Sequence, residues 1–136
     1  MKVYDAEDKV LGRLASQVAS EILDGKEVKV VNAEKSFIVG DKESILEKYR
    51  ERRARGKQMN GPKFPRRPER IFRRTVRGMI PHQEPRGRKA FKRLRAYIGT
   101  PSELENKDII EPDVKDSTGK LGLTLEEISE HLGANF

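Results

Sequence analysis

The stretch "VKVVNA", residues 28–33, decides the fold, because three valines in four positions are typical of a strand that is buried on both faces. A segment from about Gly12 to Asp24 precedes it, with apolar residues three and four positions apart and Gly25 at its end, and this pattern predicts a helix. "KVYDA", residues 2–6, predicts a short strand before the helix. Strands joined through a helix are typical of parallel pairing, so the sequence predicts an α/β fold.

The predicted scaffold continues without a break into a basic segment. "SFIVG", residues 36–40, predicts another strand, and Asp41 suits the N-cap of a helix that carries Ile45 and Tyr49 on its apolar side. This helix runs on into "YRERRARG", residues 49–56. The core and the basic surface are therefore expected to share one helix.

Charge is sharply segregated along the 136 residues. Residues 1–47 hold 7 basic and 10 acidic side chains, residues 48–95 hold 19 and 3, and residues 96–136 hold 3 and 9. Of the 15 arginines, 14 lie in the middle segment, and the planar fork of arginine suits bidentate contact with phosphates. Such a segment predicts a polyanionic partner. The simpler interpretation, a solvated charged surface, leaves many like charges repelling one another.

The most informative part of the basic segment is "PERIFRRTVRGMI", residues 68–80. Pro68 suits the first turn of a helix, and at about 100° per residue Phe72, Val76 and Met79 fall on one face. Four arginines lie on roughly the other face: Arg70, Arg73, Arg74 and Arg77. The helix is therefore predicted to pack on the protein with one side and to present guanidinium groups to phosphates or unstacked bases with the other.

Basic residues continue on both sides of this helix. Residues 56–69 contain Asn-Gly and three prolines and predict an irregular loop that can follow a partner's surface. "RGRKAFKRLRAYIG", residues 86–99, predicts a second basic helix with Ala90 and Leu94 inward, which then enters a strand at Ala96–Gly99. Arg13, at a predicted helix start, is a weaker candidate for holding a phosphate. The candidate RNA-binding residues are Arg13, Arg52, Arg53, Arg55, Lys63, Arg66, Arg67, Arg70, Arg73, Arg74, Arg77, Arg86, Arg88, Lys89 and Lys92.

Two other interpretations of the basic helix remain open at this stage, a helix lying on a membrane surface and a solvated surface helix. Neither explains why the basic surface extends well beyond that helix. Aromatic residues make up only 6% of the chain, so a stacking platform for single strands is poorly supported, and phosphate and shape contacts are favoured.

The acidic segment, residues 102–136, offers no chemistry of its own. Thr124 and Glu127 have capping-box spacing, and Leu125 and Ile128 begin the apolar side of a short helix closed by Gly133. We expect a solvated tail helix, with contact to a basic neighbour as the alternative.

Enzymatic function finds no support in the sequence. Neither G-x-G-x-x-G nor G-x-x-x-x-G-K-[ST] is present, and the only histidines, His82 and His131, show no metal-ligand pattern. The chain has no cysteine, no apolar run long enough to span a membrane and no secretory signal at its start. We therefore expect a cytoplasmic protein that is not an enzyme, with no metal, no cofactor, no small-molecule substrate and no membrane partner.

Four motifs carry a family resemblance: "GRLAS" (residues 12–16), "VVNAE" (30–34), "RIFRRTVRGMIPH" (70–82) and "RGRKAFKRLRAYIGTP" (86–101). Over residues 2–101 the chain resembles the universal large-subunit ribosomal protein number thirteen in its archaeal form. "LEEISEHLGAN", residues 125–135, also resembles archaeal members, less distinctively.

The resemblance implies a three-layer α/β/α domain around a four-stranded parallel sheet, with a basic helical and loop extension. It also implies ribosomal RNA and neighbouring large-subunit proteins as partners and an early role in subunit assembly. From the chain length and the charge segregation we expect one domain over residues 1–136, in which 1–47 and 96–101 supply the sheet core, 48–95 bind RNA and 102–136 form an acidic tail. We expect no homo-oligomer. The alternative is a regulator that binds messenger RNA or duplex DNA outside the ribosome with the same basic face.

Overall fold

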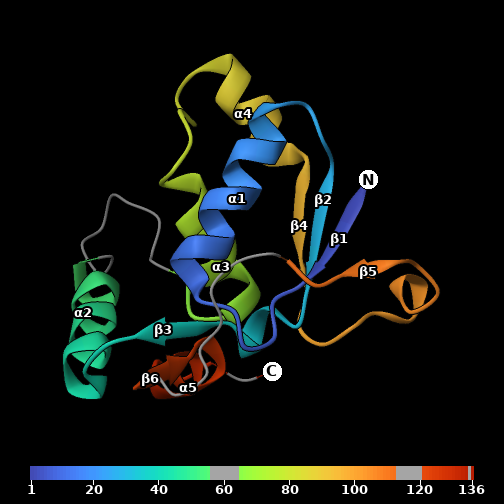
Figure 1. Cartoon of the computed structure of the whole chain (residues 1–136). Helices are drawn as coiled ribbons and strands as arrows, with labels where there is room; N and C mark the ends of the chain where they lie inside the picture. The colour runs from blue at the N-terminus through green and yellow to red at the C-terminus, as the bar shows by residue number, and fades with distance from the viewer. Residues whose placement is uncertain (56–64, 113–120, 135) are drawn as a thin grey trace.

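The computed structural model describes residues 1–55, 65–112, 121–134 and 136 (Figure 1). Helices and strands alternate through most of these ranges. The elements are β1 (Lys2–Asp5), α1 (Leu11–Leu23), β2 (Val28–Val31), the 3₁₀ turn η1 (Ala33–Lys35), β3 (Phe37–Val39), α2 (Lys42–Arg55), α3 (Pro68–Arg77), α4 (Pro85–Lys92), β4 (Leu94–Ala96), the 3₁₀ turn η2 (Ser102–Leu104), β5 (Ile109–Ile110), β6 (Gly122–Thr124) and α5 (Leu125–His131).

The main sheet has four parallel strands in the order β4-β2-β1-β5. The predicted strand β2 lies at its centre, where Val28 is in register with Lys2 of β1 on one side and with Leu94 of β4 on the other. α1 connects β1 to β2, which confirms the parallel pairing predicted from the strand, helix and strand pattern.

Alternate residues of the sheet pack against two different layers. Val28 and Val30 of β2 and Tyr4 of β1 belong to the main core, which α1, α3 and α4 cover from one side (Figure 1). Val31 points the other way and packs with Leu104 of η2. The predicted three-layer α/β/α fold is confirmed, with a thick helical layer on one face and a thin layer containing η2 on the other.

β3 is a strand, as predicted, but it does not join the parallel sheet. It pairs antiparallel with β6, and Phe37 lies opposite Thr124. The two strands approach closely at Gly122, where a Cβ atom would lie 1.9 Å from the carbonyl oxygen of Ile38. This small sheet lies with α2 and α5 beyond the carboxyl ends of β1 and β2 (Figure 1).

The strand predicted at Ala96–Gly99 is shifted in the structure, since β4 begins at Leu94 and ends at Ala96. α4 ends at Lys92, and Leu94, expected on the helix, is a fully buried residue of β4. The fourth strand of the sheet, β5, lies in the segment that the sequence assigned to the acidic tail. Two residues are too few to show the alternation by which a strand is predicted.

α5 corrects the expectation of a solvated tail helix. Leu125 and Ile128 have no exposed surface and belong to the main core. The predicted capping box is confirmed, with the Glu127 N–H donating to the Thr124 hydroxyl oxygen at 3.2 Å. Arg50 of α2 donates through Nε to Nε2 of His131 at 2.7 Å, so this histidine links two helices. Residues 122–131 are therefore part of the scaffold.

We predict that Leu125→Ala lowers the free energy of unfolding by about 2–5 kcal/mol, because it empties a fully buried site. Leu121→Ala is the matched control, since Leu121 is 64% exposed and its truncation should change stability by less than about 0.5 kcal/mol. Urea unfolding of the two variants measures the difference, and equal stabilities would contradict the placement of α5 in the core.

α4 packs tightly against the turn that precedes it. A Cβ atom on Gly87 would lie 1.9 Å from the carbonyl oxygen of Pro81. By contrast, a Cβ atom on Gly12 of α1 would meet nothing within 4 Å. The two helical glycines therefore differ in the space around them.

We predict that Gly87→Ala destabilises the protein by about 1–3 kcal/mol, since the backbone of the turn must shift to admit a methyl group. Gly12→Ala should leave stability unchanged or raise it by up to about 1 kcal/mol, because alanine favours helix. Thermal unfolding followed by circular dichroism separates the two outcomes, and a loss of stability in both variants would refute the packing argument.

Candidate nucleic-acid interface

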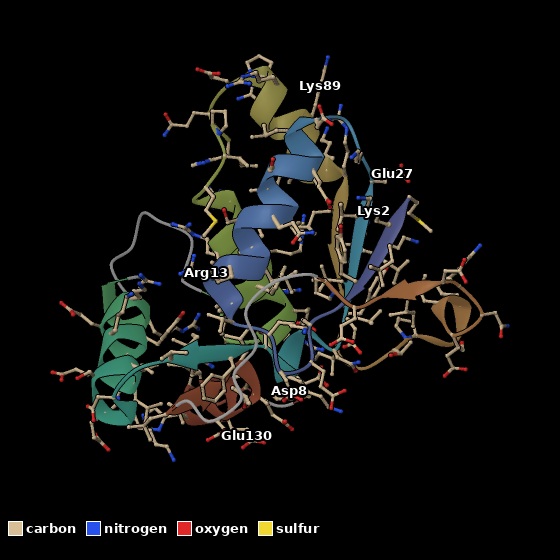
Figure 2. The ribbon with its side chains drawn as sticks, in the orientation of Figure 1. Lys2, Asp8, Arg13, Glu27, Lys89 and Glu130 are labelled. Carbon is tan, nitrogen blue, oxygen red and sulfur yellow. The ribbon has the colours of Figure 1, made fainter. Side chains whose placement is uncertain are left out.

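Three basic helices, α2, α3 and α4, carry most of the candidate residues (Figure 2). α3 is the most firmly anchored, because Ile71, Phe72 and Val76 have no exposed surface. Pro68 occupies its first turn, as predicted. The predicted apolar face is therefore confirmed at Phe72 and Val76, and Ile71 extends it.

The four arginines of α3 lie away from this anchor. Arg70 and Arg74 are exposed, and Arg73 and Arg77 are half-buried. None of the four forms an ion pair with a carboxylate in the part of the chain that the structure describes. Their charge is thus available to an external anion.

Arg73 is held in a fixed position by packing. Its guanidinium lies 4.3 Å from the centre of the Phe91 ring of α4, within the range of a cation–π interaction. Burial lowers the pKa of Arg73, and the nearby positive charges of Arg95 and Arg70 lower it further. The Nε atom is buried and has no hydrogen-bond partner among the described residues. Arg73 is therefore a positive charge between α3 and α4 that no carboxylate of the described residues neutralises.

α2 begins as predicted, with the Ser44 N–H donating to a carboxylate oxygen of Asp41 at 3.0 Å. Buried Ile45 and Tyr49 attach it to the core. Arg52 lies over the Tyr49 ring, 5.2 Å from its centre. Arg53 is half-buried, and burial lowers its pKa. The positive charge of Arg66, which precedes α3, lowers the pKa of Arg53 further, so these two arginines lie close enough to repel each other.

The remaining candidates differ in how free their charges are. Arg67 pairs with Glu69 at 2.9 Å and Arg86 pairs with Glu84 at 3.4 Å, so these two are partly neutralised. Arg88 donates to the carbonyl oxygen of Gln83 at 2.9 Å. Four further candidates are exposed and make no ion pair with a described carboxylate: Arg13, Arg66, Lys89 and Lys92. Lys63 and the side chain of Arg55 lie outside the described residues.

The candidates form an extended surface and do not converge on one point. Arg13 lies in the first turn of α1, and Lys89 lies on α4 near the opposite end of α1 (Figure 2). An extended array of cations suits a long polyanion better than a small anion. None of the helices in the described ranges has the length and apolar character that crossing a bilayer requires.

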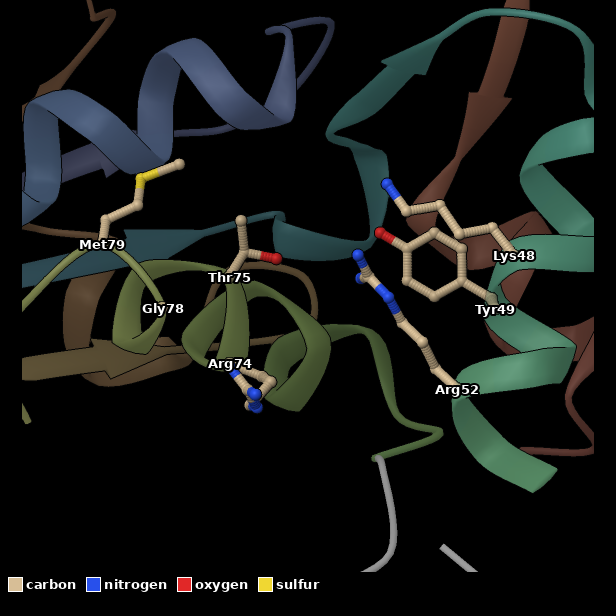
Figure 3. Close-up of a pocket in the computed structure, with 7 residues that line it drawn as sticks. All are labelled: Lys48, Tyr49, Arg52, Arg74, Thr75, Gly78 and Met79. Carbon is tan, nitrogen blue, oxygen red and sulfur yellow. The ribbon is translucent and has the colours of Figure 1, made fainter. Parts of the chain in front are cut away.

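Two residues of this surface differ from the sequence-based expectation. Met79, predicted to face inward, is 44% exposed, because α3 ends at Arg77 and the helical projection no longer holds beyond it. Lys48 was not among the candidates, although it lies one helical turn before Arg52, a spacing that places both on the same side of α2. Both residues line a cleft between α2 and α3 (Figure 3).

An α/β scaffold with an anchored helix whose four arginines pair with no carboxylate in the described ranges is typical of proteins that bind polyanions. The comparisons with known proteins specify that class. The family model described as Ribosomal protein L13 matches residues 1–103, and the chain belongs to this family. It is a family of structural proteins of the ribosome and not of enzymes.

Several archaeal proteins are similar to the chain over almost its whole length. A large ribosomal subunit protein uL13 from Methanocaldococcus jannaschii is 48% identical over 140 residues, covering 100% of both chains. Those from Methanopyrus kandleri and Archaeoglobus fulgidus are 51% and 47% identical, each match covering 96% of this chain and 86% of the relative. The predicted family is therefore confirmed.

We predict that Arg73→Met raises the free energy of unfolding by roughly 1 kcal/mol. The substitution removes a buried unsatisfied donor, which costs about 1–3 kcal/mol, and keeps a side chain that packs well on the Phe91 ring. Arg74→Met is the matched control, because Arg74 is exposed and its replacement should be neutral within about 0.5 kcal/mol. Chemical denaturation provides the measurement, and a less stable Arg73→Met variant would show that Arg73 contributes chiefly to packing.

Proposed function

We propose that this chain binds ribosomal RNA in the large ribosomal subunit through α2, α3, α4 and the loop before α3. Its role is structural, and it supports early assembly of the subunit and, through that, translation. The proposal includes the cytoplasmic ribosome as the site of action. It is supported by the family, whose archaeal members are large ribosomal subunit proteins.

The observation that carries the proposal is the two-sided structure of α3. One side is fixed in the core by Ile71, Phe72 and Val76, and the other presents four arginines without carboxylate partners among the described residues. Fixed guanidinium groups lose little conformational freedom on binding, and their fork matches the geometry of phosphate oxygens. Arg73 is fixed in this way against the Phe91 ring, and the anchored helix supports the other three arginines.

The proposed mechanism is electrostatic. Arginine and lysine side chains neutralise RNA phosphates and release condensed counterions, which allows RNA segments to approach each other closely. Because α-helices cannot read the deep major groove of A-form RNA, we infer recognition of phosphates and shape over base sequence. No covalent bond is made or broken.

The same proposal extends to protein neighbours. Exposed acidic residues of the carboxyl-terminal segment lie at η2, on the sheet face opposite to α3 and α4, and on α5, which packs against α2 and α3: Glu103, Glu105, Glu127 and Glu130. Separated charges of opposite sign allow RNA to be bound on one side while the basic surface of another large-subunit protein is met on the other. We propose that the chain acts there as a monomer, together with such neighbours.

We predict that Arg70→Glu, Arg74→Glu and Arg77→Glu together prevent incorporation into the large subunit. The exchange turns three attractive contacts with phosphate into repulsive ones. Arg73 is left unchanged because it packs on Phe91, so the variant should remain folded. Tagged protein expressed in its host is followed across a sucrose gradient at low and high salt, and we expect the wild-type protein in the large-subunit fraction and the variant at the top.

The control carries the same change in net charge at three exposed lysines outside the basic helices, Lys26→Glu, Lys35→Glu and Lys107→Glu. We expect it to sediment with the subunit. Normal incorporation of the α3 variant would refute the assigned face. A wild-type protein that stays free of ribosomes and protects a defined messenger RNA or DNA duplex would favour the regulator instead.

A further inference from the structure

A cleft of about 540 Å³ separates α2 from α3 on the basic side of the molecule (Figure 3). α2 contributes Lys48, Tyr49 and Arg52. α3 and the residues after it contribute Arg74, Thr75 and Met79. Figure 3 shows the α2 side chains pointing across the cleft toward α3. The volume lies within the range of about 300–1,000 Å³ that is usual for small-ligand sites.

The positive charge of the residues that line the cleft favours an anionic ligand. Three lining side chains are cationic and none is acidic. Lys48 and Arg74 are exposed, and neither pairs with a carboxylate in the described ranges. A phosphate group entering between the two helices can therefore contact cations on both walls.

The cleft is also lined by an aromatic and an apolar side chain, Tyr49 and Met79, which a site for phosphate alone does not need. Met79 exposes 44% of its surface, although it is apolar and surrounded by a strongly basic surface. On the facing wall the Arg52 guanidinium lies over the Tyr49 ring, 5.2 Å from its centre. A methionine thioether and a guanidinium plane are both surfaces on which a flat aromatic ring packs well.

Thr75 adds one hydrogen-bond acceptor to the lining of the cleft. Its hydroxyl donates to the carbonyl oxygen of Ile71 at 2.9 Å. The hydroxyl hydrogen is thus engaged, and the oxygen can only accept from a ligand. An acceptor beside an apolar wall suits the ring N–H or the exocyclic amine of a nucleobase.

We propose that this cleft accepts one unstacked nucleotide of the RNA, with its base between Met79 and the Tyr49–Arg52 pair and its flanking phosphates at Lys48 and Arg74. The inference rests on the proposed function and makes it specific, because it assigns base contact to one place on an otherwise phosphate-binding surface. Ribosomal RNA contains loops and bulges whose bases can be turned outward to enter such a site.

Met79→Ala in the full-length protein tests this assignment. The substitution leaves every charge in place and removes only the apolar wall, so affinity for large-subunit ribosomal RNA transcribed in vitro should fall about ten-fold at fixed salt. The dependence of affinity on salt should keep its slope, since no phosphate contact is lost. Met79→Leu should restore most of the affinity. Leu121→Ala, which truncates an exposed apolar side chain of the β3 and β6 sheet region, is the matched control and should bind as wild type.

Each outcome separates this inference from the proposed function. If Met79→Ala binds within two-fold of wild type while the α3 charge reversals abolish binding, the cleft inference is wrong and the RNA-binding face stands. Normal RNA affinity combined with poor entry of Met79→Ala into subunits would also overturn it, in favour of an apolar protein side chain as the occupant. A wild-type protein without affinity for the transcript would refute the proposed function itself.

Discussion

The parallel pairing of β2 with a strand on each side is the constraint on which the structure depends. Val28, Val30 and Val31 lose all contact with solvent, and their alternation assigns helices to one face of the sheet and η2 to the other. Pairing with β1 requires a crossover, which α1 supplies. β4 follows α4 directly in the sequence, so the pairing of β2 with β4 fixes the carboxyl-terminal end of the segment that contains α3 and α4 to the sheet.

The basic surface is stable only because it is anchored in this way. The four arginines of α3 have no carboxylate partner among the described residues, and their charges repel one another. An isolated helix of this length and charge would be unstable in water. Burial of three large side chains of α3 offsets that repulsion. Arg73 shows the balance most clearly, because its charge remains at the junction of α3 and α4 despite burial and two like-charged neighbours. Such strain is typical of positions retained for binding.

The helices and the first three strands could be predicted from the sequence, and the strands β5 and β6 could not. β1, α1, β2 and the buried side of α3 follow from periodicity, and the capping box identified the start of α5. β5 and β6 contain two and three residues, too few to show any period. The burial of Leu125 depends on contacts with distant elements, which local pattern does not encode. Met79 was misassigned because the helix ends two residues earlier, and the cleft exists only through the approach of α2 to α3.

The pairing of β3 with β6 joins residues that are far apart in the chain, with Phe37 opposite Thr124. All three basic helices lie between these partners in the sequence and are therefore synthesised before the scaffold can close. During translation the arginines emerge while Leu125 and Ile128, which complete the core, are still to be made. The nascent protein thus passes through a period as an exposed polycation with an unfinished core, when access to RNA and to other anions in the cell must be controlled.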